Sequence, residues 1–201
     1  MESLYLQTLV NNKKLEFMKN LLFIAAILFS FSCSAQEYPL NTSYRTIPKG
    51  SYLKDTKNEL PRYTGVWKTV FNNKEITLDI QKVDKFLTKF LNYSYYGDVV
   101  MVRFTVKDGN GNILQSTMSR GVNESNIVSS YVLPNAKLGL RYSGGDCSVG
   151  SGIIYLQYID ATHLKWSYSP QDLIFMEGEC PQGSDLKVYL PKTEDLIFTK
   201  Q

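Results

Sequence analysis

The sequence predicts an all-β protein, an antiparallel barrel of about eight to ten strands. Two observations predict this fold. Apolar and polar residues alternate along several short segments, as in the segment 76–81, Ile-Thr-Leu-Asp-Ile-Gln, and a period of two is typical of a strand with one buried face. Turn residues separate these segments at short intervals, which is typical of antiparallel sandwiches and barrels.

The strands follow one another along the chain. Val100, Val102, Phe104 and Val106 share one face of a long strand, and the Gly/Asn-rich segment 107–112 predicts a hairpin turn after it. The other segments that read as strands are 113–118, 127–133, 137–142, 153–159, 164–168, 186–190 and 196–199.

One segment fits two structures. Val83, Phe86, Leu87, Phe90 and Leu91 lie at helical spacing, which favours a short helix over 84–92. The same residues could instead prolong the preceding strand. The helix is the favoured interpretation.

The N-terminal region predicts export. Three lysines, at positions 13, 14 and 19, precede an apolar run from Leu21 to Phe31, and small residues then lead to polar Gln36. This is the order of a secretory signal peptide, and the run is shorter than the roughly 20 apolar residues of a membrane-spanning helix. We expect an upstream extension at 1–17, a signal peptide at 18–35, and a location in the periplasm, on the outer membrane as a lipoprotein, or outside the cell.

Two cleavage sites are open. Cleavage after Ala35 would place the small residues Cys33 and Ala35 at the two critical positions. Cleavage after Ser32 would leave Cys33 at the new N-terminus, where a bacterial lipoprotein carries its lipid. The mature chain is therefore expected to begin at Gln36 or at a lipidated Cys33, and that lipid is the one membrane contact we expect.

Residues 36–62 are predicted to form an N-terminal arm or linker ahead of the barrel domain at 63–201. Pro39, Pro48 and Pro61 interrupt this stretch, and no apolar period runs through it.

The segment 63–67, Tyr-Thr-Gly-Val-Trp, opens the first strand of the barrel domain. Its Gly65-x-Trp67 resembles the start of lipocalin-type barrels. Together with the Cys-Ser-Ala-Gln export signal, Asn41 and Tyr44 in the arm and the closing segment 196–201, it makes the chain resemble a family of uncharacterised lipocalin-like exported proteins or lipoproteins from outer-membrane-bearing bacteria. The resemblance implies that Trp67 closes one end of the barrel.

Cys147 and Cys180 are predicted to form a disulfide. An exported protein with two cysteines in its mature domain usually pairs them. Cys147 precedes the strand 153–159 and Cys180 follows the strand 164–168, so both lie at the same end of that hairpin. The alternative is a Cys–His hydrolase, in which Cys147 is the nucleophile and His163 is the base, although His163 falls on the polar face of its strand.

Composition excludes several functions. The single histidine excludes a multi-histidine metal site and a His-Glu-x-x-His zinc hydrolase. A net charge of +3 with no cluster of Lys and Arg gives no basis for nucleic-acid binding. We therefore predict no catalytic residue, no metal and no cofactor.

By analogy with its fold, the protein is expected to bind a small apolar or amphipathic ligand inside the barrel. The alternative is a structural or interaction protein of the cell envelope, in which the barrel is filled and the loops engage a protein or a glycan.

Overall fold

The computed structural model describes Lys14, Glu16, Met18 and Lys19 and the residues 36–171 and 180–201. The chain divides into two compact units, Met1–Gln36 and Glu37–Gln201. Cys33, nearly all of the predicted signal peptide and most of the predicted upstream extension lie outside the described residues. Among the residues that are described, no helix is long and apolar enough to cross a membrane.

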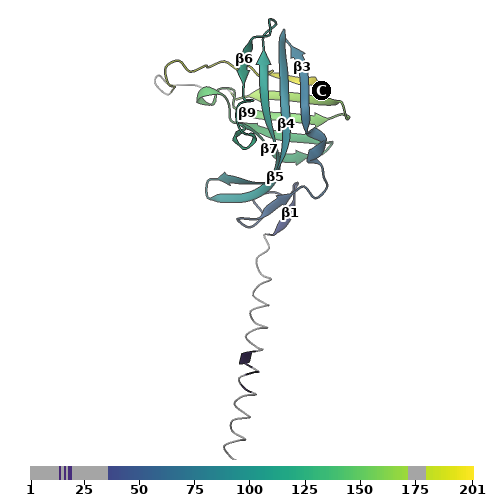
Figure 1. The fold of residues 1–201 in the computed structure, drawn as a ribbon, viewed down its shortest axis with the longest axis vertical. Helices are drawn as coiled ribbons and strands as arrows, with labels where there is room; N and C mark the ends of the chain where they lie inside the picture. The colour runs from purple at the N-terminus through teal and green to yellow at the C-terminus, as the bar shows by residue number, and fades with distance from the viewer. Residues whose placement is uncertain (1–13, 15, 17, 20–35, 172–179) are drawn as a thin grey trace, which may run out of the picture. The chain divides into compact units, whose positions relative to one another are not determined.

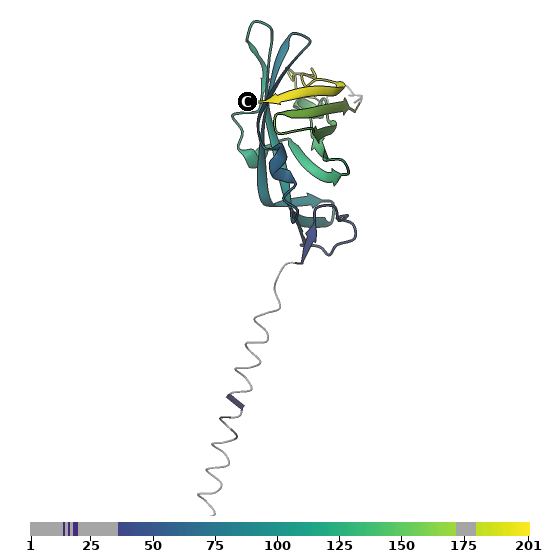
Figure 2. The ribbon, with the colours of Figure 1, turned by 90° about the vertical axis from the view of Figure 1, so that its right-hand side faces the viewer.

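The second unit is a β-barrel with a small sheet attached (Figures 1 and 2). Eight strands of the described chain close into the antiparallel barrel, in the spatial order β5-β4-β3-β11-β10-β9-β8-β7, and β7 pairs again with β5. Their bounds are β3 Gly65–Phe71, β4 Lys74–Phe90, β5 Tyr93–Lys107, β7 Ile127–Leu133, β8 Lys137–Tyr142, β9 Gly152–Tyr158, β10 His163–Pro170 and β11 Thr193–Lys200.

Three short strands and three 3-10 turns complete the described part of this unit. They are β1 Glu37–Pro39, β2 Tyr52–Lys54, β6 Ile113–Ser116, η1 Leu60–Tyr63, η2 Val122–Glu124 and η3 Asp146–Ser148. Strand β6 pairs with the end of β5. Strands β1 and β2 run parallel to the start of β5 and extend the sheet there.

The barrel interior is filled by its own side chains. The apolar faces predicted for β4 and β5 point inward, and Leu78, Val102 and Phe104 are fully buried. Trp67 and Trp166 are fully buried in the same cluster, to which every barrel strand contributes. A barrel of about eight strands is just wide enough to be filled in this way, so the predicted ligand site inside the barrel meets a packed core.

The helix favoured at 84–92 is wrong, because β4 continues as a strand to Phe90. A bulge between Val83 and Phe86 shifts the register against β5, and Lys85 in the bulge has a φ of 54°. The extra residues interrupt the period of two, so the apolar side chains on either side of the bulge fall at helical spacing. The lengthened hairpin runs past the barrel, beside β1 and β2 (Figure 1).

The strand expected at 186–190 is also wrong, because this segment is irregular. Leu186 and Val188 are exposed, Leu190 is buried in the core, and Tyr189 packs against it. The segment alternates as a strand would, but closure of the barrel leaves it no partner: β10 is already paired with β9 and β11, and β3 with β4 and β11.

The stretch 36–62 packs against the barrel more closely than an arm would. It supplies β1, β2 and η1, and Ile47, Leu53 and Leu60 are buried. The proline-rich sequence hides this packing because single apolar residues, rather than a periodic face, make the contacts.

Candidate functional site

The predicted disulfide is present. Cys147 and Cys180 are bonded, and their Cα atoms lie 5.9 Å apart, within the usual range. The bond joins the loop before β9 to the segment after β10, so the expectation that both cysteines lie at one end of this hairpin is confirmed.

The structure does not bring Cys147 and His163 together. Cys147 precedes β9, whereas His163 begins β10 at the far end of the same hairpin. His163 Nδ1 lies 3.0 Å from Asp160 Oδ1 and 3.0 Å from the hydroxyl of Thr162. Both contacts form at an exposed turn. In the described chain, no three His, Cys, Asp or Glu side chains gather as a metal site.

Trp67 lies in the core beside η1. Its indole N–H donates a hydrogen bond of 2.9 Å to the carbonyl of Tyr63, and Lys200 Nζ lies 5.1 Å from the ring centroid. These contacts place Trp67 between the start of β3 and the end of β11, where the two strands meet.

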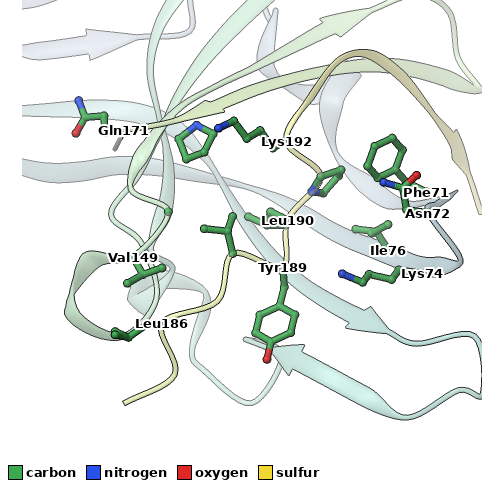
Figure 3. Close-up of a pocket in the computed structure, with 14 residues that line it drawn as sticks. Phe71, Asn72, Lys74, Ile76, Val149, Gln171, Leu186, Tyr189, Leu190 and Lys192 are labelled. Atoms are coloured by element: carbon green, nitrogen blue, oxygen red, sulfur yellow. The ribbon is translucent and has the colours of Figure 1, made fainter. Parts of the chain in front are cut away.

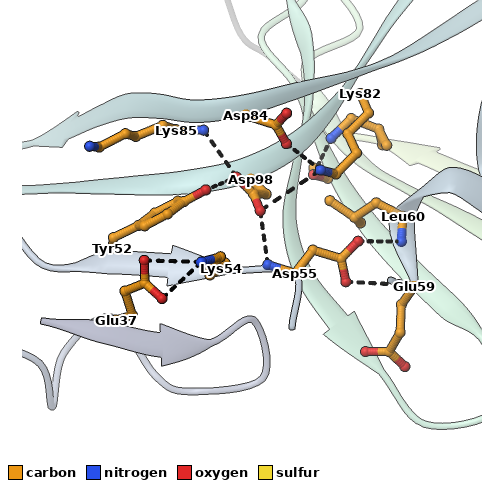
Figure 4. A network of polar contacts seen from close by, with 12 residues as sticks. Glu37, Tyr52, Lys54, Asp55, Glu59, Leu60, Lys82, Asp84, Lys85 and Asp98 are labelled. Carbon is orange, nitrogen blue, oxygen red and sulfur yellow. Dashed lines mark hydrogen bonds and ion pairs between the residues drawn. The ribbon is translucent and has the colours of Figure 1, made fainter. Parts of the chain in front are cut away.

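A buried carboxylate, Asp98, ties the small sheet to the bulge in β4 (Figure 4). It accepts hydrogen bonds from the hydroxyl of Tyr52 and from the backbone amides of Asp55, at 2.9 Å, and Lys85, at 3.0 Å. Lys82 Nζ lies 3.9 Å away. Tyr52 and Asp55 belong to β2 and the turn directly after it, whereas Lys85 belongs to the bulge of β4, so Asp98 acts as a structural clamp between these two segments.

Burial and hydrogen bonding shift the pKa of Asp98 in opposite directions. Burial alone would raise the pKa of Asp98, but the bonds from Tyr52 and the two amides outweigh it, and the pKa lies below its ordinary value. Burial, followed by the bond to Asp98, raises the pKa of the Tyr52 hydroxyl. Both shifts hold Asp98 as a carboxylate and Tyr52 as its donor at neutral pH.

A first pocket lies at one end of the barrel, with a volume of about 510 Å³ (Figure 3). The turn between β3 and β4 and the irregular segment 186–192 form much of its lining. Figure 3 shows the rings of Phe71 and Tyr189 and the amines of Lys74 and Lys192 around it. The irregular segment 186–192, rather than paired strands, forms much of its lining, and its volume is smaller than that of the second pocket, so this pocket is the weaker of two candidates.

The second pocket lies outside the barrel and is larger, about 730 Å³. We call it the arm groove. One wall comes from the lengthened β4–β5 hairpin and the segment 40–44, and the other from the outward face of β7, β8 and β9. Its lining residues are Leu40, Asn41, Thr42, Ser43, Tyr44, Leu53, Phe86, Leu87, Thr88, Lys89, Phe90, Tyr95, Ser125, Asn126, Val128, Ser129, Ser130, Tyr131, Val132, Arg141, Ser143 and Ile153.

One row of side chains crosses the floor of the arm groove. Val128 pairs with Arg141, and Arg141 pairs with Ile153, on three neighbouring strands. Their inward neighbours, such as Leu140 and Ile154, are buried in the core, so alternation turns this row outward. A guanidinium therefore stands between two aliphatic side chains.

The opposite wall is aromatic and braced. The rings of Tyr44 and Tyr95 are stacked with centroids 5.5 Å apart, and burial raises the pKa of the Tyr95 hydroxyl. Phe86 and Phe90 line the groove from β4. Asn126 Oδ1 is buried in the lining and accepts no hydrogen bond from the described residues. The groove thus combines apolar walls with a few polar groups, as small-molecule sites do.

Sequence reasoning placed the binding site inside the barrel and missed this groove. The signal was present in the apolar residues at 83–91, whose helical spacing concealed a strand with a bulge. The tyrosines at 93–96 were a second signal, and Tyr95 lines the groove. Neither signal could locate Arg141, because its neighbours across the sheet depend on the barrel order.

The described residues define a closed antiparallel barrel with a filled interior and an amphipathic groove on its outer wall. This confirms the predicted all-β barrel. The chain belongs to the DUF6705 family, a family of unknown function, which it matches over residues 18–201. Comparison with curated proteins and with solved structures gives no match. The resemblance to lipocalins stays a prediction.

Proposed function

We propose that the protein binds a small amphipathic ligand, an apolar chain or ring system with an anionic end, in the arm groove. The observation that carries this proposal is Arg141 standing between Val128 and Ile153 on the floor of the groove. The proposal keeps the class of ligand expected from the sequence and moves its site to the outside of the barrel.

The size and lining of the groove support this ligand class. A volume of about 730 Å³ lies within the usual range for small-molecule sites, roughly 300–1,000 Å³. Phe86, Phe90 and Leu40 supply apolar surface along one wall, where burial of a hydrocarbon chain is favourable.

The charge of the floor supports an anionic end. Arg141 makes no ion pair with a carboxylate of the described residues. Its planar guanidinium can hold a carboxylate through two parallel hydrogen bonds.

The test compares two probes that differ only in their polar end, oleate and oleyl alcohol. Residues 36–201, which contain the compact unit Glu37–Gln201 with its own core, are melted with each probe. A probe at about 100 times its dissociation constant should add about 2.7 kcal/mol of stability. Titration calorimetry then gives the two affinities.

Variants separate the groove from other sites. Arg141→Gln should weaken oleate by about tenfold or more, because a charged hydrogen bond is lost, and should leave oleyl alcohol nearly unchanged. Ser130→Trp should fill the groove and weaken both probes. Arg120→Gln, at an exposed arginine outside the groove, and His163→Ala are matched controls that should change neither affinity. Binding that survives both groove variants would refute the site.

The filled interior favours one rival function, an interaction protein of the cell envelope that engages a protein or a glycan through its loops. This rival predicts no stabilisation by any amphipathic probe. It also predicts a cross-linked partner when the protein is treated with a cross-linker in its native envelope. A rise in melting temperature with oleate that Arg141→Gln abolishes would argue against this rival function.

We also propose that the protein is exported, with a mature N-terminus at Gln36 or at a lipidated Cys33. The Cys147–Cys180 disulfide supports this, because such bonds persist in oxidising compartments. Intact-mass analysis of the protein from its native host separates the two forms, since acyl chains add mass. Recovery of unprocessed chain from the cytoplasm would contradict export.

A further inference from the structure

The turn between β4 and β5 exposes apolar side chains at its end. We call residues 90–93, Phe-Leu-Asn-Tyr, the hairpin tip. Leu91 is 91% exposed and Phe90 49% exposed. Leu91 is the most exposed of the large apolar side chains in the described chain. Contact of this leucine with water is unfavourable, so its burial against a partner would be favourable.

The backbone at Leu91 makes its presence more unusual. Its φ is 51°, a left-handed conformation that favours Gly or Asn and is uncommon for a bulky residue. The turn between β3 and β4 of the same barrel uses Asn72 and Asn73 at its two left-handed positions. A leucine at position 91 is therefore unfavourable both for the backbone conformation of the turn and for its exposure to water. Such a conflict is typical of functional positions.

The tip is held in place. The hydroxyl of Tyr93 donates to the carbonyl of Ile47 at 3.4 Å, and the ring of Tyr93 meets that of Tyr44 edge to face. The amide of Gly50 donates to the carbonyl of Ser94 at 2.8 Å. These contacts brace the base of the tip, so its apolar end is presented on a fixed support.

Positive charge surrounds the tip. Lys49 and Lys89 line the same surface depression as Leu91 and Tyr93. The neighbouring segments 41–53 and 85–97 also contain Arg45 and Lys85 and hold no Asp or Glu. Glu37 of β1 lies at the same end, and its carboxylate is paired with Lys54. An apolar end with a basic rim complements a negatively charged lipid surface, where aromatic and apolar side chains lie at headgroup level and lysines meet the anionic groups.

The direction of the chain agrees with such a surface. Strands β1 and β2 run parallel to β5, and Glu37 pairs with Tyr52, which pairs with Tyr96. The N-terminal end of β1 therefore faces the same edge of the small sheet as the hairpin tip. The mature chain, whether it begins at Gln36 or at Cys33, would thus enter the small sheet at this edge.

We propose that the hairpin tip docks on an anionic lipid bilayer, with Leu91 inserted at the headgroup level and Lys49 and Lys89 against the lipid phosphates. This contact is separate from any lipid on Cys33. It goes beyond the expectation that a lipid is the only link to the membrane.

The experiment measures sedimentation of residues 36–201 with vesicles of phosphatidylcholine alone or mixed with phosphatidylglycerol. The protein should bind the mixed vesicles, and added salt should weaken this binding. Leu91→Asn should reduce the partition coefficient by about tenfold or more, since a leucine no longer inserts. Asparagine suits the left-handed turn, so the melting temperature should not fall. The paired variant Lys49→Glu with Lys89→Glu should remove the preference for mixed vesicles.

A control variant and two other results complete the test. Val70→Thr changes an exposed apolar residue on β3, which is 69% exposed, and should leave vesicle binding unchanged. Equal binding of Leu91→Asn and the unmodified protein would overturn the proposal. So would a concentration-dependent dimer in size-exclusion chromatography that Leu91→Asn dissociates, in the absence of vesicle binding, because the tip would then dock on a second copy of the chain.

Discussion

Removal of the Asp98 carboxylate should be among the most damaging single changes in the small sheet. Asp98→Ala leaves three donors without their acceptor: the hydroxyl of Tyr52 and the amides of Asp55 and Lys85. A hydrogen bond to a charged group contributes about 1.5–3 kcal/mol, and an unsatisfied buried donor costs about 1–3 kcal/mol. Because these losses share one network and do not add fully, we expect about 3–5 kcal/mol of lost stability.

Asp98→Asn tests the part that charge plays. Asparagine keeps the shape and one acceptor oxygen, but it turns an amide NH₂ toward one set of donors. We expect a loss of about 2–3 kcal/mol, between the unmodified protein and Asp98→Ala. Urea unfolding of residues 36–201, followed by circular dichroism, measures both values. Glu37→Gln is the matched control, since the exposed pair of Glu37 with Lys54 should contribute no more than about 1 kcal/mol.

The pH dependence gives a second, independent readout. The pKa of Asp98 is lower in the folded protein than its ordinary value, which is about 3.9. Its ionised form therefore stabilises the fold fully above that value, and this contribution is lost as the pH falls through the lower folded pKa. The stability gap between the unmodified protein and Asp98→Asn should accordingly narrow below about pH 4. A loss under about 1 kcal/mol for Asp98→Ala, or a gap that does not change with pH, would refute the clamp.

Two further changes test the barrel. The paired variant Cys147→Ser with Cys180→Ser should lower the free energy of unfolding by about 3–4 kcal/mol, because the bridge closes a loop with a sequence separation of 33. In the unmodified protein, unfolded without reductant, thiol titration should find neither cysteine reactive. Reactive thiols at both positions would contradict the bond. Trp67→Ala should cost about 3–5 kcal/mol in the same urea assay, since it removes a fully buried indole and its bond to Tyr63, and a loss within about 0.5 kcal/mol would show that the indole is not part of the core.

The sequence predicted the barrel well where a strand pairs with the next strand along the chain through a short turn. The segments 127–133 and 137–142 match β7 and β8 to the residue, because alternation and a turn at Asn135 act together. The segment 186–190 alternates equally well and forms no strand. The reason lies in the topology: a segment can form a strand only beside another strand with an unpaired edge, and closure of the barrel leaves no such edge nearby.

The candidate site was harder to predict, for a physical reason. The disulfide depends on one hairpin, so spacing along the chain was enough to predict it. The arm groove depends on the bulge at Lys85, which sets the course of the lengthened hairpin, and on the cross-strand row of Val128, Arg141 and Ile153. A shift of one residue in either place would turn a different set of side chains toward the groove, and local patterns do not determine that register.

The closure of the barrel has a mechanical consequence. In the described chain, β5 and β7 share a single residue pair, Met101 with Val128. Serine hydroxyls supplement it: Ser129 Oγ accepts from the amide of Val100 at 2.9 Å, and Ser125 Oγ donates to the carbonyl of Val102 at 2.7 Å.

Such a junction works as a clasp. Side-chain hydroxyls can rotate away from their partners while the ladders between the other strands stay intact, so we expect local opening of the barrel to begin here. The arm groove spans this clasp, with Tyr95 of β5 on one side and Ser129 of β7 on the other. A ligand bound in the groove would contact both strands and stabilise the junction, so ligand binding would also favour the closed barrel.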